Sequence, residues 1–277
     1  MIRLIRSSAI VLALAGVSVA GVTSFAHAVP SVDASSSDAK AIMQAVHEHT
    51  GGPRSLSRMK MTIKEGSSSK DRSMTSRSLR FAEGRKSLLL IEDPADVRNT
   101  GFLSIDYSSK ADEQWLYLPK VKRVARVPNS GKSDPFVGSD FSYSDLSQQN
   151  PSDYDFTIIA QSEKVGDEDT WHIAGKPKTE TVRDETGYSQ TEIWVSKSKL
   201  IVVQLKATLV KDNKTKYLKA SEIKQVDGVW SPFRMQMRTL QGGKLVSETL
   251  LEVLSLKNDA PEVGDRDFTQ ERLSRGI

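Results

Sequence analysis

Apolar and polar residues alternate along most of the chain after residue 54. Residues 58–64 place Met59, Met61 and Ile63 on one face and charged residues or threonine on the other, which is the period of a half-buried strand. The same alternation recurs in residues 154–161 and 229–240. Residues 200–210 form the most apolar of the predicted strands.

Short turns separate these segments, and Asp227-Gly228 is a strong hairpin signal. The pattern predicts about eleven or twelve strands in sequential order, which favours an antiparallel meander. A sheet of that width has to curl. We therefore predict a mainly β fold with few helices: a curved, incomplete antiparallel barrel with an apolar concave side.

Two segments are predicted to close the concave side. Residues 39–49 form an amphipathic helix that Gly51-Gly52-Pro53 ends. Residues after Pro128 form a polar loop of about 20 residues, a length that is uncommon inside a compact domain unless the loop is functional or disordered. Aromatic residues within this loop favour order, since their burial offsets the entropy of ordering the chain.

Residues 1–28 have the pattern of a cleavable signal peptide, with Arg3 and Arg6 before an apolar stretch and Ala-His-Ala at 26–28. An uncleaved membrane anchor is the alternative. Cleavage leaves residues 29–277 as one domain in the periplasm, and loss of the two arginines lowers the formal charge from +4 to +2. That charge is a weak argument for nucleic-acid binding. With no cysteine, the chain has no disulfide and no lipidated N-terminal cysteine.

Catalytic patterns are missing from the sequence: there is no nucleophile elbow, zinc-protease motif or phosphate-binding loop. His47 and His49 are two residues apart in the predicted helix and point to different sides, so we expect no metal there. His172 lies within a strand and is interpreted as a packed or rim residue. Three aspartates lie beside serines in the long loop and are interpreted as turn and cap residues that hold it: Asp134, Asp140 and Asp145. We expect no enzyme activity, cofactor or metal.

Two other features each leave two interpretations open. Paired methionines in strands suit a surface that adapts to varied apolar shapes, but they also fill ordinary cores. A run of cations without an acid between them includes Lys120, Lys122, Arg123 and Arg126, followed by Lys132. It is either a strand edge protected against unwanted pairing or a positive rim for anionic lipid headgroups or an acidic partner.

Three runs of sequence resemble the outer membrane lipoprotein-sorting protein family, whose members are similar to the lipoprotein carrier LolA. They are W-L-Y-L-P at 115–119, K-V-K-R-V at 120–124 and K-S-D-P-F-V-G-S-D-F-S-Y-S-D-L at 132–146. The resemblance extends to D-G-V-W-S-P at 227–232 and is to the branch associated with RND/MMPL-type exporters. The family signature falls on Lys132, Ser133, Asp134, Phe136, Gly138, Ser139, Asp140 and Phe141.

This resemblance implies a LolA-like half-barrel around a hydrophobic cavity. It implies a monomeric periplasmic carrier in a Gram-negative bacterium, which moves lipid, lipoprotein acyl chains or other hydrophobic cargo towards the outer membrane. The expected cargo contacts are Met59, Met61, Ile63, Leu116, Leu118, Phe233, Met235 and Met237. The alternative is a non-enzymatic docking module of an RND/MMPL-type inner-membrane exporter. A lipid-acting enzyme, dependent on His172 or Asp140, is a third hypothesis.

Overall fold

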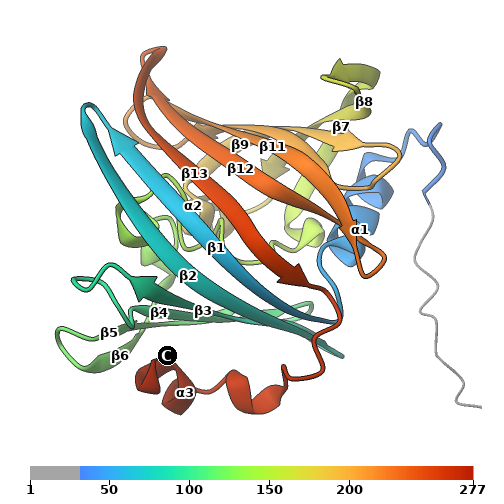
Figure 1. Ribbon diagram of the computed structural model, residues 1–277. Coiled ribbons are helices and arrows are strands. Elements are labelled where there is room, and N and C mark those ends of the chain that lie inside the picture. Colours follow the sequence, from blue (N-terminus) through green and yellow to red (C-terminus); the bar gives the residue numbers. More distant parts are fainter. Residues whose placement is uncertain (1–31, 277) are drawn as a thin grey trace, which may run out of the picture.

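A computed structural model describes residues 32–276 and shows one curved antiparallel sheet of thirteen strands (Figure 1). The two edge strands do not pair with each other, so the barrel is incomplete, as predicted. The predicted signal peptide, residues 1–28, lies outside the described residues. The strands are β1 Arg54–Glu65, β2 Ser68–Phe81, β3 Gly84–Asp93, β4 Gly101–Tyr107, β5 Glu113–Leu118, β6 Arg123–Arg126, β7 Tyr154–Val165, β8 Glu168–Pro177, β9 Tyr188–Ser196, β10 Val202–Leu209, β11 Lys214–Val226, β12 Val229–Gln241 and β13 Lys244–Lys257.

Three α-helices and four short 3-10 turns complete the described residues. None of the helices there is long and apolar enough to cross a membrane. The helices are α1 Ala39–His49, α2 Glu180–Thr186 and α3 Gln270–Arg275, and the 3-10 turns are η1 Asn129–Gly131, η2 Phe136–Gly138, η3 Pro151–Asp153 and η4 Asp265–Asp267.

The strand order departs from the predicted sequential order at one place. Strands β1–β6 and β7–β13 form two meanders, which join where β1 pairs with β13. As a result β6 and β7, although consecutive in sequence, lie at opposite edges of the sheet. The connection between them, residues 127–153, has to pass from one edge to the other, and we call it the plug loop. This crossing explains why the loop is so long.

Strand β3 shows how both faces of the sheet are covered. Leu89 and Ile91 belong to an apolar cluster on the concave side, together with Met61 of β1. Leu88 and Leu90 face the other way and pack against residues of the C-terminal tail that include Phe268 and Leu273. Alternation along a strand sends neighbouring side chains to opposite faces, so a continuous apolar run requires cover on both.

Helix α1 occupies the concave face at the β7 edge. The side chain of Asp38 caps it by accepting a hydrogen bond from the Ala41 N–H at 2.9 Å. Ile42 packs into a cluster with Trp171 of β8 and Val195 of β9. The predicted helix and its bounds are confirmed, and the helix closes one half of the concave side.

The packing of the C-terminal tail against the convex face of the sheet can be tested by measuring stability. Leu273 is fully buried against the convex face, so Leu273→Ala should lower the free energy of unfolding by about 2–5 kcal/mol. Leu254→Ala, at a side chain that is 65% exposed, should change it by no more than about 0.5 kcal/mol. Urea denaturation measures both. Equal effects would show that the tail does not contribute to the core.

Candidate functional site

The apolar cluster on the other half of the concave face contains most of the predicted cargo contacts. Met59, Met61, Ile63 and Met237 are buried within it, and Leu116 and Met235 pack against it. Two predicted contacts are not brought into this cluster. Leu118 is exposed, and Phe233 is half-buried, with the Lys224 ammonium 4.3 Å from its ring centroid. Whether the clustered residues bind cargo stays a prediction.

The plug loop covers this cluster with its own aromatic side chains. Phe136 and Phe141 are buried in it, and Tyr143 packs against it. The rings of Phe136 and Tyr143 lie 5.3–6.1 Å, centroid to centroid, from the ring of Phe102 on β4. The apolar part of the concave face is therefore filled by the protein's own side chains, and the open hydrophobic cavity that the family resemblance implies is not found there in the described residues.

Asp140 anchors the plug loop to β12 and β13. Its carboxylate accepts hydrogen bonds from the hydroxyls of Thr239, Ser247 and Thr249, the last at 2.7 Å. The Asp140 N–H donates to the Thr249 hydroxyl oxygen at 2.9 Å. The strand register brings the three hydroxyls together, because Thr239 is opposite Ser247 and Met237 is opposite Thr249. The buried carboxylate is thus satisfied by hydroxyl donors.

Asp145 is a second anchor, to β9 and β11. Its carboxylate accepts hydrogen bonds from the Tyr188 hydroxyl at 2.7 Å, from the Lys216 ammonium at 3.2 Å and from the Ser142 N–H at 2.8 Å. Burial, followed by the charge of Asp145, raises the pKa of Tyr188 well above its ordinary value. Tyr188 therefore remains a donor. The two aspartates together tie the loop to four strands, which agrees with their interpretation as residues that hold it.

Lys132 fixes the first part of the plug loop to α2. Its buried ammonium lies 3.0 Å from the Glu185 carboxylate, and its carbonyl oxygen accepts from the Ser144 N–H at 2.8 Å. Lys132 therefore does not belong with the exposed cations that precede it. Lys120, Lys122, Arg123 and Arg126 all lie exposed in the β5–β6 hairpin and have no ion pair within residues 32–276.

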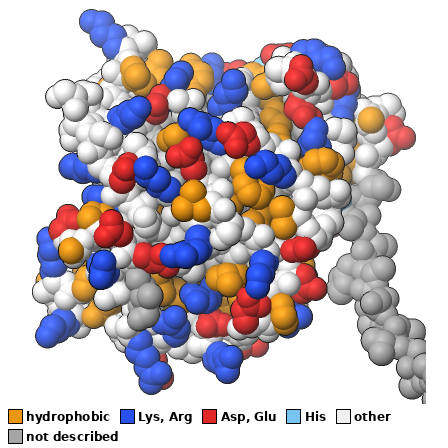
Figure 2. Space-filling view, in the orientation of Figure 1, with side chains coloured by type: hydrophobic (Ala, Val, Ile, Leu, Met, Phe, Trp, Pro, Cys, Tyr) orange, Lys and Arg blue, Asp and Glu red, His pale blue; other side chains and the backbone are white. Residues whose placement is uncertain are grey.

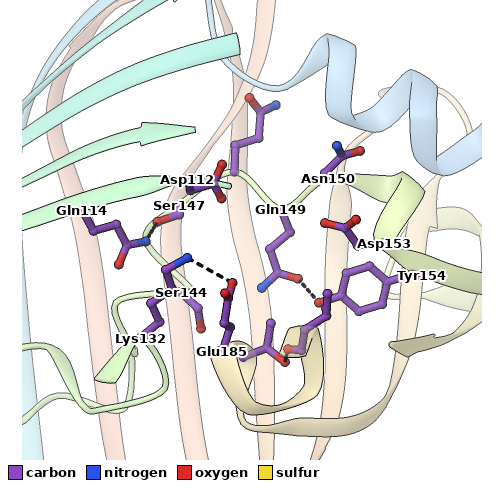
Figure 3. A pocket seen from close by; sticks show the side chains of 13 residues that line it. Asp112, Gln114, Lys132, Ser144, Ser147, Gln149, Asn150, Asp153, Tyr154 and Glu185 are labelled. Carbon is purple, nitrogen blue, oxygen red and sulfur yellow. Dashed lines mark hydrogen bonds and ion pairs between the residues drawn. The ribbon is translucent and has the colours of Figure 1, made fainter. Parts of the chain in front are cut away.

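A small polar pocket of about 50 Å³ lies beside this ion pair, where the plug loop meets α2 (Figure 3). Figure 3 shows Gln114 hydrogen-bonded to Ser147, and Tyr154 donating to Gln149. Burial raises the pKa of Asp112 and of Asp153, the acids on its wall. The pocket is too small for a lipid, so we interpret it as part of the loop's attachment.

The last part of the plug loop is attached to β4 and α1. The Gln148 N–H donates to the Asp106 carboxylate at 2.9 Å, and the Gln148 side chain donates to the His47 carbonyl oxygen at 2.6 Å. The His47 ring Nδ1 lies 3.0 Å from the Gln149 carbonyl oxygen, a contact that requires a proton on Nδ1. Burial lowers the pKa of His47. His47 thus helps to hold the last part of the plug loop in place.

An open cleft of about 660 Å³ separates the plug loop and α2 from the ends of β1 and β10–β13. Its lining is mixed in polarity and includes Asp134, Gly138, Arg183, Lys211, Lys216 and Val246. Asp140 and its partners Thr239 and Ser247 also line it. Because of this, solvent or a ligand that enters the cleft reaches the wall formed by the Asp140 anchor.

The other polar residues named in the sequence analysis lie apart from these anchors. Ser139 caps the tip of the plug loop through its hydroxyl, which accepts a hydrogen bond from the Phe141 N–H at 3.2 Å, and Ser133 lines the cleft.

His172 lies on the opposite face of β8 from Trp171 and Ile173. Its ring stacks on Trp194, and its Nδ1 lies 2.9 Å from the Glu163 carboxylate. It cannot touch a ligand on the concave face. No cluster of three or more metal-binding side chains occurs within the described residues.

Solved structures resemble both the fold and the sequence of this chain. An outer membrane lipoprotein-sorting protein domain from Vibrio parahaemolyticus is 30% identical, with a TM-score of 0.77 over 86% of this chain and 98% of that one. The chain belongs to the outer membrane lipoprotein-sorting protein family. The family that the sequence runs resemble is therefore confirmed.

Two further structures agree with this assignment. A DUF1329 family protein from Desulfovibrio piger is 26% identical, with a TM-score of 0.76 over 85% of this chain and 97% of that one. A LolA superfamily protein from Nitrosomonas europaea shares the fold at 18% identity, with a TM-score of 0.65 over 84% and 98% of the two chains. A family model described as "Uncharacterized protein" matches residues 83–275. No curated protein sequence matches the chain.

Asp106 makes the attachment of the plug loop sensitive to pH. Burial raises its pKa from 3.8 to about 7, against the opposing effect of hydrogen bonds from Gln148 and Ser104. Because the pKa of Asp106 is higher in the folded than in the unfolded state, protonation of its carboxyl group stabilises the fold. This contribution of Asp106 is fully present below pH 3.8 and is lost as pH rises through about 7. Asp106→Asn removes this titration, so the variant should gain stability relative to the original chain between pH 4 and 7.5. Urea denaturation across that range measures the difference.

An exposed acid in the β7–β8 turn provides the control for lost charge. Asp167→Asn should leave the difference in stability from the original chain constant across the same pH range. If Asp106→Asn also ran parallel to the original chain, Asp106 would not be the titrating group.

Proposed function

We propose that this protein is a periplasmic carrier of lipid-like cargo, in which the plug loop occupies the cargo's place while the carrier is empty. One observation carries the proposal. The apolar concave face is covered by a loop with aromatic side chains, and that loop is held by side-chain anchors that water can replace. Membership of a lipoprotein-sorting family supports the class of cargo.

An exchange between the plug loop and an acyl chain is energetically balanced. Displacement of Phe136, Phe141 and Tyr143 exposes the apolar face that they cover, at a cost of about 25 cal/mol per Å². An acyl chain in the same place removes that surface from water again. The methionines at 59, 61, 235 and 237 suit this exchange, because their flexible side chains adapt to a different occupant.

The anchors make opening reversible. Each hydrogen bond to a charged group contributes about 1.5–3 kcal/mol net, since water replaces the lost partner on opening. The carboxylate of Asp140 already borders the open cleft, so it regains hydration without crossing an apolar region. Val137, at the loop's tip, has a positive φ of 44°, a costly conformation for a β-branched residue. Opening would release that strain.

A docking module of an inner-membrane exporter is the second candidate. The observation that favours it is the β5–β6 hairpin, whose exposed Lys120, Lys122, Arg123 and Arg126 have no ion pair among the described residues. A module that carries nothing would keep its plug loop closed permanently. Mass spectrometry of lipid extracted from the purified mature protein is the first test, since stoichiometric lipid excludes a module that carries nothing. A lipid-free protein is either that module or the empty carrier, and binding of an added fatty-acid probe separates these two.

The plug loop can be locked in a chain that has no cysteine of its own. In the double variant Asp140→Cys/Thr249→Cys, a disulfide would replace the contact between the Asp140 N–H and the Thr249 hydroxyl. The oxidised form should bind an environment-sensitive fluorescent fatty acid at least tenfold more weakly than the original chain. Reduction should restore binding and speed uptake, since the reduced form lacks the Asp140 anchor. Fluorescence titration measures affinity, and stopped flow measures the rate.

A cross-link elsewhere controls for the disulfide itself. Thr62→Cys/Asp71→Cys joins facing residues of β1 and β2 on the face opposite Met61 and Ile63, and should bind the probe normally in both redox states. Tight binding by the oxidised Asp140→Cys/Thr249→Cys form would exclude the loop as a gate. Absence of binding in every form would exclude a carrier.

A further inference from the structure

Several hairpin tips project from the same side of the molecule as the open cleft. The turns of β10–β11 and β12–β13 border the cleft directly, through residues such as Lys211 and Val246. The tips of β1–β2 and β5–β6 lie at the same end of the antiparallel strands, at the upper left and the lower left of Figure 1. We call residues 118–123, 210–214 and 241–246 the mouth surface.

Exposed apolar side chains concentrate on the mouth surface. Five of the eight large hydrophobic side chains exposed within residues 32–276 lie there: Leu118, Val121, Val210, Leu245 and Val246. Val121 is 65% exposed and Leu245 is 59% exposed, each at the tip of a hairpin. These residues come from three separate hairpins, so the concentration is a property of the folded surface and not of one segment.

Unpaired cations accompany these apolar side chains. Lys120, Lys122, Arg123, Lys211 and Lys244 are all exposed, and none forms an ion pair in the described part of the chain. Within the mouth surface the one acid is Asp212, which pairs with Lys214 at 3.2 Å. Glu65, Asp134 and Asp184 line the adjoining cleft, so the excess of positive charge belongs to the hairpin tips and not to the cleft wall. Figure 2 shows blue and orange side chains along the left margin, with some red ones among them.

We propose that the mouth surface docks on an anionic lipid bilayer. Lysine and arginine near such a surface gain attraction from its negative potential, while apolar tips bury themselves at the boundary between headgroups and acyl chains. Docking in this orientation puts the cleft against the lipid, so that cargo enters or leaves the concave face without crossing water. This last step rests on the proposed carrier function, whereas docking itself does not.

Flotation with vesicles tests docking without any cargo. The purified mature chain should float with phosphatidylcholine vesicles that contain phosphatidylglycerol, and at least tenfold more weakly with phosphatidylcholine alone. Lys120→Gln/Lys122→Gln/Arg123→Gln should weaken binding to the anionic vesicles by about a hundredfold, at about fivefold for each cation. Val121→Ser/Leu245→Ser should weaken it on both kinds of vesicle.

Two control variants remove cations or an apolar side chain outside the mouth surface. Lys110→Gln/Lys164→Gln/Arg266→Gln takes away three exposed cations outside the mouth surface, and Leu254→Ser replaces an exposed leucine on β13. Both controls should float like the original chain, and circular dichroism verifies that every variant is folded.

Two results would overturn the proposal. If the original chain does not float with anionic vesicles, the mouth surface fits an acidic partner protein instead. If both triple variants lose binding equally, the attraction comes from overall charge and not from this surface. Probe binding in solution, measured without vesicles, tests the carrier separately, so failure of docking and failure of the carrier are distinguished.

Discussion

The crossing between the two edges of the sheet is the constraint on which the rest of the structure depends. Because β1 pairs with β13, the consecutive strands β6 and β7 are as far apart as the sheet permits. The chain has to bridge the open side of the half-barrel to continue. A bridge over an apolar face is stable only if it brings apolar side chains of its own, and the plug loop does so with Phe136 and Phe141.

The polar contacts of the plug loop complement this apolar packing. The loop is not held in place by a sheet ladder. Side chains attach it instead: Asp140 and Asp145 bind hydroxyls and an ammonium on four strands. Lys132 and Gln148 hold its two ends to α2 and to α1. Such contacts are specific in position, yet each is exchangeable with water. The arrangement therefore combines a defined closed state with a feasible open one.

Local patterns in the sequence predicted the elements well. The alternation in residues 58–64 identified β1, and Asp227-Gly228 identified the β11–β12 turn. After Pro128, the turn formers identified the loop as irregular, and its aromatic residues identified it as ordered. They also indicated that the long loop closes the concave side. Each of these inferences depends on neighbours within a few residues, where periodicity and turn chemistry act directly.

Contacts between residues far apart in the sequence could not be predicted from these local patterns. Nothing near β1 indicates that its partner is β13, and the hydroxyls that hold Asp140 lie about a hundred residues further along the chain. Asp106, His47 and Tyr188 were missed as supports of the loop for the same reason. Leu118 was assigned to the cargo site as an apolar residue close in sequence to the long loop, whereas its place at a hairpin tip leaves it exposed.

The central claim is that the plug loop leaves the concave face when cargo enters. The most direct measurement is the distance between spin labels at Asp134→Cys in the loop and Val246→Cys on β13, which line opposite sides of the cleft. Pulsed electron resonance should give one short distance for the empty protein and a longer, broader distribution once an acyl ligand is bound stoichiometrically. An unchanged distance in the presence of bound ligand would contradict the account.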